Sequence, residues 1–449
     1  LASWLLAPAR AEQIRERQAA VEELRTQLDL REQIGVVGSE LRPRIHPQKL
    51  IEWAESPRLL SSMWLRWVVA ALALAVAATG AWALVGGPYQ PVVALLAVTV
   101  LIRRVLTKRA ESVVSGANAN AEGLELFARI LQLLEGQNFR GEELARIRAA
   151  LKGEQECASQ GVFSLARIIY WVDAREGLMA KIADWAFLYT VQVAFAAEAW
   201  RARSGRNLRI WIDVAAEMEA LLALSAYAYE HPSDPFPEIV EDGAEIVGEA
   251  LAHPLLPSAS AVRNSVALGD KTRVLLVSGS NMSGKSTYLR TVGINAVMAM
   301  AGAPVRAKSL RLTPLGIGTR MRTADSLQEG RSGFYSEVLR IRQVFDLLKG
   351  TLPVLFLLDE LLEGTNSRDR RIGAEGLLAA LVRAGAIGIV TTHDLALTEV
   401  AQSLDGASRN AHFQDHIEAG KMRFDYTLRD GVVSKSNAIE LMRLAGLDV

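Results

Sequence analysis

Residues 279–287 match the pattern GxxxxGK[ST] and read Gly279-Ser280-Asn281-Met282-Ser283-Gly284-Lys285-Ser286-Thr287. A β-rich run, 273–277, precedes them, and a segment with helical spacing follows them. This strand–loop–helix context predicts a phosphate-binding loop. Its glycines let backbone N–H groups turn toward phosphate oxygens, and the helix that follows adds the positive end of its dipole.

The whole loop belongs to the predicted nucleotide site, and two of its side chains have special roles. Lys285 is expected to place its charge on the β- and γ-phosphates, which also makes it the first predicted catalytic residue. Ser286 is expected to offer its hydroxyl to Mg²⁺. The sequence therefore predicts ATP and Mg²⁺ as cofactors.

Two apolar runs downstream lead to side chains suited to the same chemistry. Residues 355–358 end at Asp359 and Glu360. Asp359 is placed to hold Mg²⁺, and Glu360 is placed to orient the attacking water. A further run, Ala386–Thr391, leads to His393. A lone histidine is usually structural, but at this strand end His393 can reach the γ-phosphate, and it is the third predicted catalytic residue.

The patterns along the chain indicate the fold class, a helical core combined with α/β. From about Glu238, short β-rich runs alternate with helical patterns, which implies a mainly parallel sheet covered by helices. Upstream, apolar periodicity predicts helices, including one over 10–34 and one from about Leu208 to Tyr229. The expected domains are an N-terminal helical segment, a hairpin, a helical core and a P-loop domain, at 1–57, 58–109, 110–237 and 238–449.

A charge-free stretch, 67–85, interrupts the helical part. Its 19 residues span about 28 Å as a helix, close to the ~30 Å hydrocarbon core of a bilayer. Gly86-Gly87-Pro88 then predicts a turn, and a second apolar run, Pro91–Ile102, is short for a span. Basic residues on both outer flanks predict a transmembrane hairpin with both ends in the cytoplasm. The alternative is a buried helical hairpin of a soluble protein.

Charge and cysteine content limit the other functions. Lys+Arg and Asp+Glu both number 50, so the overall charge gives no argument for binding nucleic acid. The single cysteine, Cys157, excludes an internal disulfide framework and a multi-cysteine zinc site in this sequence. It also fits a reducing compartment.

Several motifs beyond the phosphate loop resemble those of the MutS family, whose ATPase domain is of the ABC type. Asp325–Phe334 resembles the signature loop of that family, and Glu363–Ser367 resembles the loop after its acidic pair. The other matching motifs are Asn281-Met282, His253-Pro254, Ser434-Lys435-Ser436 and Ala445-Gly446-Leu447. The resemblance covers residues 240–449 closely and 110–240 loosely, as a MutS-like helical core.

The resemblance implies an ATPase that converts ATP and water to ADP and phosphate, as a homodimer with composite ATP sites. Ser332 would then contact the nucleotide of the partner subunit, and His412 would lie near the adenine. The aromatic residue that the family places on the other face of adenine is replaced by Ala261-Val262.

Residues 58–109 have no counterpart in the repair protein and resemble a membrane-associated bacterial subgroup of MutS-like proteins. This resemblance implies the bacterial inner membrane as the location, the lipid bilayer as a partner and a cytoplasmic ATPase domain. The mismatch-reading domain of the family, with its aromatic-x-Glu wedge, has no match in the sequence.

Four functions are compatible with a chain that carries an ATP site. The expected one is a dimeric, ATP-driven switch anchored in a membrane. The alternative is a DNA-mismatch-repair or DNA-structure-binding ATPase with reduced recognition parts, which binds DNA weakly or without specificity. Intact Asp359 and Glu360 argue against a scaffold that only binds ATP. The lack of an LSGGQ signature argues against an ABC transporter.

Overall fold

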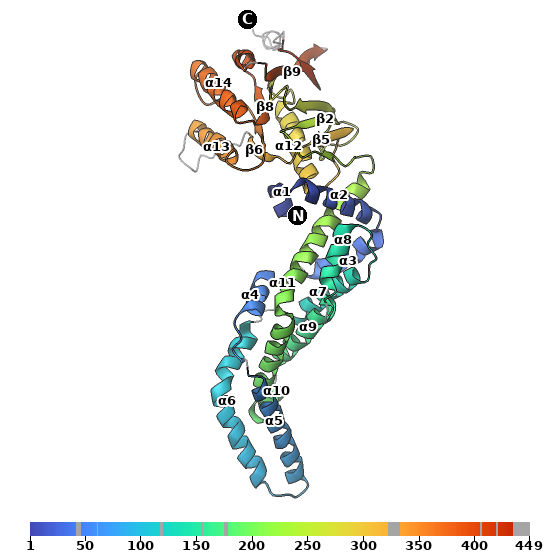
Figure 1. The fold of residues 1–449 in the computed structure, drawn as a ribbon, viewed down its shortest axis with the longest axis vertical. Helices are drawn as coiled ribbons and strands as arrows, with labels where there is room; N and C mark the ends of the chain where they lie inside the picture. Colours follow the sequence, from blue (N-terminus) through green and yellow to red (C-terminus); the bar gives the residue numbers. More distant parts are fainter. Residues whose placement is uncertain are drawn as a thin grey trace. The chain divides into compact units, whose positions relative to one another are not determined.

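The computed structural model describes most of the chain in two compact units. The described residues are 1–41, 46–60, 62–116, 120–153, 156–174, 178–321, 333–404, 406–418 and 421–433. Ser332, most of the signature-like loop and the motifs after Val433 lie outside these residues. One unit, here called the α/β unit, comprises Leu1–Arg25 and Ala223–Val449, and the other, the helical unit, comprises Thr26–Leu222 (Figure 1).

The α/β unit contains a six-stranded main sheet in the order β10-β9-β4-β8-β7-β6. Its strands are β4 (Val274–Ser278), β6 (Gly316–Arg320), β7 (Val354–Leu358), β8 (Ile387–Thr392), β9 (Ser408–Glu418) and β10 (Lys421–Asp430). All neighbouring pairs are parallel except β9 and β10. The mainly parallel sheet that the sequence predicts is therefore confirmed.

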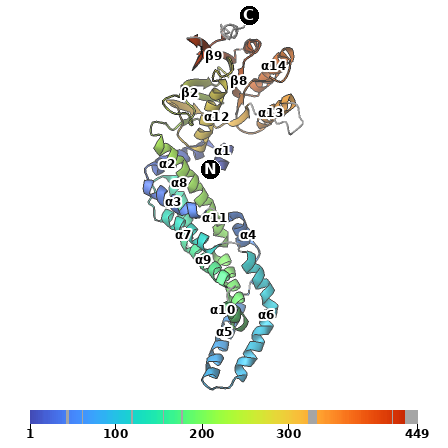
Figure 2. The ribbon, with the colours of Figure 1, turned by 180° about the vertical axis from the view of Figure 1, so that it is seen from behind.

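Helices cover both faces of the main sheet, so that its central strands β4, β7 and β8 are buried at every position. Leu355 and Leu357 of β7 pack toward α12 (Lys285–Ala301), while Phe356 and Leu358 pack toward the opposite layer. That layer consists of α13 (Gly333–Leu347), α14 (Ser367–Arg383) and a 3₁₀ helix, η1 (Leu395–Ser403). Figures 1 and 2 show α13 and α14 on one side of the sheet and α12 on the other. Alternation of side chains along each strand thus builds two cores.

A second, four-stranded sheet and two N-terminal helices complete the α/β unit. The strands, in the order β1-β5-β2-β3, are β1 (Glu238–Ile239), β5 (Ser309–Leu312), β2 (Ile246–Leu251) and β3 (Asn264–Leu268), and the helices are α1 (Ala2–Leu6) and α2 (Ala11–Arg25). Arg15 of α2 donates hydrogen bonds to Glu241 and to the carbonyl of Ile239. Ile14 joins the core beside α12. These contacts hold residues 1–25 to the α/β unit.

Two helices expected from the sequence differ in extent from those of the structure. The helices of the helical unit, besides α5 and α6, are α3 (Leu28–Leu41), α4 (Pro47–Glu55), α7 (Ala121–Glu135), α8 (Glu142–Leu151), α9 (Ala158–Ala174), α10 (Leu178–Phe187) and α11 (Tyr189–Glu230). The single helix expected over 10–34 is wrong, because α2 ends at Arg25 and α3 begins at Leu28. The separate helix expected from Leu208 is also wrong, because α11 continues through Gly205. A Cβ there would lie 2.8 Å from the carbonyl oxygen of Ala54, so this glycine serves close packing.

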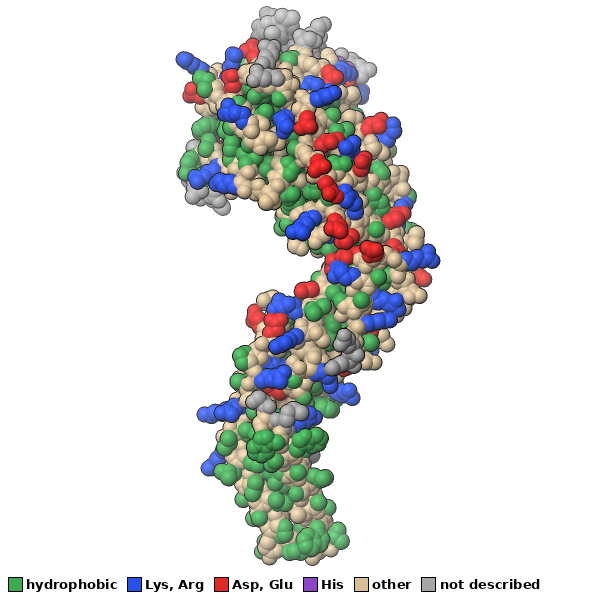
Figure 3. All heavy atoms as spheres, in the orientation of Figure 1, with side chains coloured by type: hydrophobic (Ala, Val, Ile, Leu, Met, Phe, Trp, Pro, Cys, Tyr) green, Lys and Arg blue, Asp and Glu red, His purple; other side chains and the backbone are tan. Residues whose placement is uncertain are grey.

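Two apolar helices, α5 (Met63–Leu84) and α6 (Gln90–Gly116), pack against each other as a hairpin within the helical unit. Both are long and apolar enough to cross a membrane, and only 11% of the most apolar part of each is buried. The helix α6 is longer than the run Pro91–Ile102 because it continues through the basic residues that follow. Figure 3 shows hydrophobic side chains gathered over this hairpin, with Lys and Arg side chains where it meets the other helices.

Candidate nucleotide site

The phosphate loop lies between β4 and α12, and its glycines are required by its shape. Gly279 and Gly284 have φ angles of 153° and 107°, in the region that favours glycine. A Cβ on Gly279 would lie 2.8 Å from Oγ of Ser283 and 2.9 Å from the carbonyl oxygen of Phe413. The loop therefore turns tightly against β9 and opens directly into α12, as its sequence predicts.

Lys285 is buried and lies across the loop. Its Nζ donates hydrogen bonds of 2.8 Å to the carbonyl oxygens of both Gly279 and Ser280. Burial lowers the pKa of Lys285, and the nearby carboxylates of Glu360 and Asp359 oppose this effect. The ammonium is thus fixed beside the space into which the loop and the first turn of α12 direct their N–H groups.

Asp359 follows β7 and meets Ser286 of α12 and Thr391 of β8. Its Oδ1 accepts hydrogen bonds from Ser286 Oγ at 3.0 Å and from Thr391 Oγ1 at 2.6 Å. Its Oδ2 is buried and has no hydrogen-bond partner among the described residues. A buried carboxylate oxygen without a partner is costly, and oxygen ligands suit Mg²⁺. Asp359 and Ser286 therefore fit the predicted metal site.

Glu360 lies beside the loop, and His393 lies near it. The Glu360 N–H donates to Thr391 Oγ1 at 3.0 Å. His393 Nδ1 is 3.9 Å from Glu360 Oε1, and ligand atoms of Glu360, Glu363 and His393 all lie within 4.8 Å of one another. The ends of β7 and β8 thus bring two predicted catalytic side chains together at the edge of the sheet.

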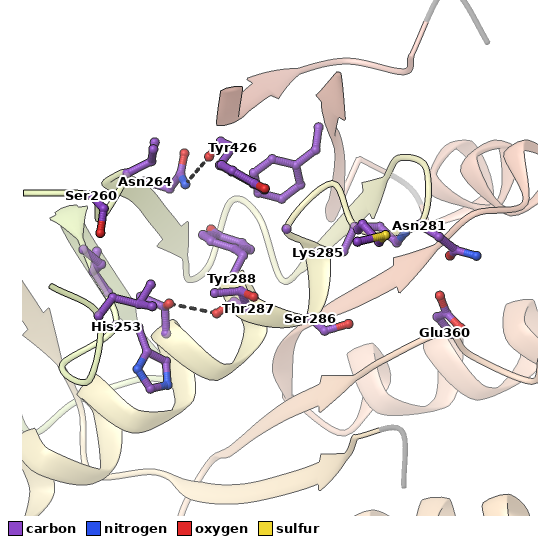
Figure 4. A pocket seen from close by; sticks show the side chains of 17 residues that line it. His253, Ser260, Asn264, Asn281, Lys285, Ser286, Thr287, Tyr288, Glu360 and Tyr426 are labelled. Atoms are coloured by element: carbon purple, nitrogen blue, oxygen red, sulfur yellow. Dashed lines mark hydrogen bonds between the residues drawn. The ribbon is translucent and has the colours of Figure 1, made fainter. Parts of the chain in front are cut away.

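A pocket of about 600 Å³ extends from the phosphate loop toward the small sheet. Its lining includes six of the predicted loop residues and Glu360, the loop residues being Asn281, Met282, Gly284, Lys285, Ser286 and Thr287. Gly279, Ser280, Ser283, Asp359 and His393 are not among the lining residues. Figure 4 shows Asn281 and Glu360 on one side of this pocket and His253 and Ser260 on the other. The pocket can therefore hold phosphates at one end and a base at the other.

The base end of the pocket differs from the sequence expectation. His412 does not line it, and the Nδ1 atom of its ring is 3.0 Å from the carbonyl oxygen of Gly431. Tyr426 does line the pocket, beside Gly284 of the phosphate loop, from a bulged part of β10 where the backbone has a φ of 54°. Asn264 donates to the carbonyl oxygen of Tyr426 at 2.9 Å. Sequence reasoning missed Tyr426, because the bulge that turns it toward the loop gives no local sequence signal.

Comparison with known proteins finds a family match within the α/β unit. Residues 275–449 match the family described as MutS domain V. The chain is 38% identical over 196 residues to Endonuclease MutS2 of Thermus thermophilus, covering 43% of this chain and 25% of that protein. It is 35% identical over 216 residues to DNA mismatch repair protein MutS of Brevibacillus brevis, covering 46% of this chain and 25% of that protein.

A eukaryotic relative extends the match slightly. The chain is 34% identical over 255 residues to DNA mismatch repair protein msh3 of Aspergillus fumigatus, covering 54% of this chain and 22% of that protein. The chain thus spans about a quarter of the length of the curated relatives that it matches. The matched family model lies within the α/β unit, and the chain is similar there to domain V of MutS proteins.

Proposed function

We propose that the chain binds Mg²⁺-ATP in the pocket of the α/β unit and hydrolyses it to ADP and phosphate. One observation carries the proposal: Ser286, Asp359 and Thr391 form a hydrogen-bonded cluster beside Lys285, with Glu360 at its edge. Binding of phosphate, coordination of Mg²⁺ and orientation of water each have a side chain there. If the loop had only a structural role, a buried Asp359 oxygen without a hydrogen-bond partner among the described residues would serve no purpose.

Each residue has a definite part in this mechanism. The loop N–H groups and the first turn of α12 bind phosphate oxygens, and Lys285 adds a positive charge. Ser286 and Asp359 would hold Mg²⁺, and the ion would supply positive charge to offset that of the phosphates. Glu360 orients the attacking water and accepts its proton. His393, whose Nδ1 lies 3.9 Å from Glu360 Oε1, would contact the γ-phosphate.

A Lys285→Ala variant tests the phosphate end of the pocket. We expect ATP to bind at least about tenfold more weakly, because a hydrogen bond to a charged group is worth about 1.5–3 kcal/mol. Titration with a fluorescent ATP analogue measures this change. Lys271→Ala is the control, because Lys271 is exposed and lies before β4. Equal affinity of wild type and Lys285→Ala would contradict the assignment.

A DNA-related role for this ATPase is the function that the relatives favour. The names of the relatives include a mismatch repair protein and an endonuclease. We infer that ATP binding and hydrolysis in this chain serve the recognition of DNA, in a homodimer with composite ATP sites. The zero net charge indicates that any binding to duplex DNA is weak. Because such binding depends on Lys and Arg contacts with phosphates, we expect it to fall steeply with salt.

A binding titration on DNA decides how selective this role is. At about 150 mM salt, we expect a mismatched and a matched duplex to bind with affinities within about tenfold, or ~1.4 kcal/mol, of each other. The reason is that no segment of the 449 residues has the pattern of a mismatch-reading wedge. A strong preference for a G·T or looped duplex would show that recognition resides elsewhere in this chain.

Membrane anchoring through the α5–α6 hairpin is a second candidate function, and we propose the lipid bilayer as its partner. Trp64, Trp67, Leu74, Trp82 and Leu101 are all exposed large hydrophobic side chains on this hairpin. Tryptophan is typical of the membrane–water interface, and leucine of the hydrocarbon region. An exposed apolar surface of this extent is unusual in a monomeric soluble protein.

Basic residues give this proposed anchor an orientation. Arg66 lies at the start of α5, and Arg104, Lys108 and Arg109 follow the apolar part of α6, all of them exposed. The turn at the other end of the hairpin carries no charge. Positive charge favours the cytoplasmic side of a membrane. The N-terminal end of α5 and the C-terminal end of α6, together with the ATPase, therefore belong in the cytoplasm of a bacterial cell.

A further inference from the structure

The turn after β7, which carries Glu360, has a backbone conformation that is unfavourable by itself. Glu360 and Leu362 have φ angles of 52° and 56°, in the left-handed region that residues other than glycine rarely adopt. Such conformations persist only where the surrounding structure holds them, and they gather at functional sites. The contacts that hold this turn therefore bear on how Glu360 is placed.

Arg320, the last residue of β6, holds the turn from one side. Its Nη1 donates to the carbonyl oxygen of Asp359 and, at 3.3 Å, to that of Glu360. Its own carbonyl oxygen accepts the N–H of Asp359 at 2.8 Å. One arginine thus contacts the backbone of both acidic residues.

Glu337 of α13 joins Arg320 to the next part of the turn. Its Oε2 is 3.3 Å from Nη2 of Arg320, and its Oε1 accepts the N–H of Leu362 at 2.7 Å. The Glu337 side chain is only 2% exposed and that of Arg320 13%. Burial raises the pKa of Glu337, and the charge of Arg320 opposes this effect. The buried pair therefore links α13 to the backbone of the turn.

Arg370 of α14 holds the far side of the same turn. Its guanidinium donates to the carbonyl oxygens of Leu362, Glu363 and Thr365 at 3.0–3.2 Å. It also pairs with Asp394 at 3.2 Å, directly after His393. The segment from Asp359 to Thr365 is thus fixed by side chains from β6, α13 and α14.

We propose that Arg320 and Glu337 are positioning residues that set the place of Glu360, so that the rate of ATP hydrolysis depends on where α13 lies. The proposal rests on the proposed ATPase function and assigns a regulatory contact within the same site. Displacement of a catalytic group by about 1 Å can slow a reaction about 10²-fold. Any ligand or partner that moves α13 would then change turnover through this buried pair, without touching ATP.

An Arg320→Lys variant tests the proposal, because lysine keeps the charge but cannot donate to two carbonyls and a carboxylate in a fixed fork. We expect kcat for ATP to fall at least about tenfold, while the Kd for ATP changes less than about threefold. The control is Arg273→Lys. Arg273 lies at the opposite end of the same sheet, where it contacts the carbonyl of Gly385 at 3.0 Å and pairs with Asp270.

A double-variant cycle separates positioning from general damage to the fold. Glu337→Gln keeps an acceptor for the Leu362 N–H but loses the charge that faces Arg320. If the pair acts as one unit, Arg320→Lys with Glu337→Gln should lower kcat no more than the worse single variant. Thermal unfolding checks folding, and if Arg320→Lys does not fold, Glu337→Gln alone should show the fall in kcat at unchanged Kd.

The outcomes distinguish this proposal from the proposed function. Wild-type kcat in a folded Arg320→Lys or Glu337→Gln variant would overturn the positioning role and leave the ATPase intact. Parallel losses of kcat and ATP affinity, or an equal loss in Arg273→Lys, would also overturn it. Absence of ATP turnover in the wild-type chain would instead remove the proposed function, and the positioning role with it.

Discussion

A Glu360→Gln variant is expected to bind ATP with near wild-type affinity and to hydrolyse it at least about 10²-fold more slowly, the usual scale for losing a general base. The amide keeps the size of the side chain and the hydrogen bond from the Glu360 N–H to Thr391, so the turn should keep its shape. What it loses is the negative charge that orients the water and takes up its proton. Steady-state release of phosphate gives the rate, and nucleotide titration gives the affinity.

Glu375→Gln is the matched control for this measurement, because Glu375 is an exposed residue of α14 in the same unit. It should hydrolyse ATP at the wild-type rate. Equal rates for wild type and Glu360→Gln would remove Glu360 from the mechanism. Loss of ATP binding in Glu360→Gln would show instead that the carboxylate supports the pocket.

The full chain is expected to partition with membranes and to resist carbonate extraction, whereas a chain without the apolar part of the hairpin should be soluble. The deletion is best confined to residues 67–102, with a short flexible linker. Leu106, Ala110 and Val113 of α6 are buried, and the Val113 carbonyl accepts a 2.8 Å hydrogen bond from the Trp53 indole. Removal of this C-terminal part of α6 would damage the helical unit itself. Flotation with liposomes measures the difference.

Full-length protein that is soluble and monodisperse without detergent would contradict the membrane proposal. A milder test replaces the exposed side chain of Leu74, near the middle of the apolar stretch of α5, by Arg. A charge at the centre of a membrane-spanning helix costs about 2.5–3.5 kcal/mol on insertion scales, so this variant should leave the membrane fraction. The deletion variant should keep its ATPase activity, because the pocket lies wholly in the α/β unit.

The parts of the site that could be predicted from sequence are those made by contiguous residues. The phosphate loop and the acidic pair after β7 each depend on a short pattern, in which a strand must end where the chemistry begins. Arg320, Glu337 and Tyr426 carry no such pattern. Arg320 matters because β6 pairs with β7 in register, and this pairing is set by the whole sheet.

The fold, like the site, could be predicted where local sequence patterns determine it and not where tertiary contacts do. Alternation of short strands and helices predicts the α/β class, because it reflects burial on both faces of a parallel sheet. The extent of α11 could not be predicted, because Gly205 would ordinarily weaken a helix, and its close packing against the Ala54 carbonyl is a tertiary contact. The assignment of residues 1–25 to the α/β unit depends on side chains such as Arg15, which bind partners more than 200 positions away.

The single hydroxyl oxygen of Thr391 contacts both acidic residues of the site, Asp359 and Glu360. It donates to the Asp359 carboxylate and accepts the N–H of Glu360. Valine has nearly the same volume and would fill this fully buried space, yet it would leave the Glu360 N–H without its acceptor and Asp359 without one donor. Mutational tolerance at this position therefore depends on one oxygen atom as well as on size, and serine, which is smaller and keeps the hydroxyl, is expected to conserve both contacts.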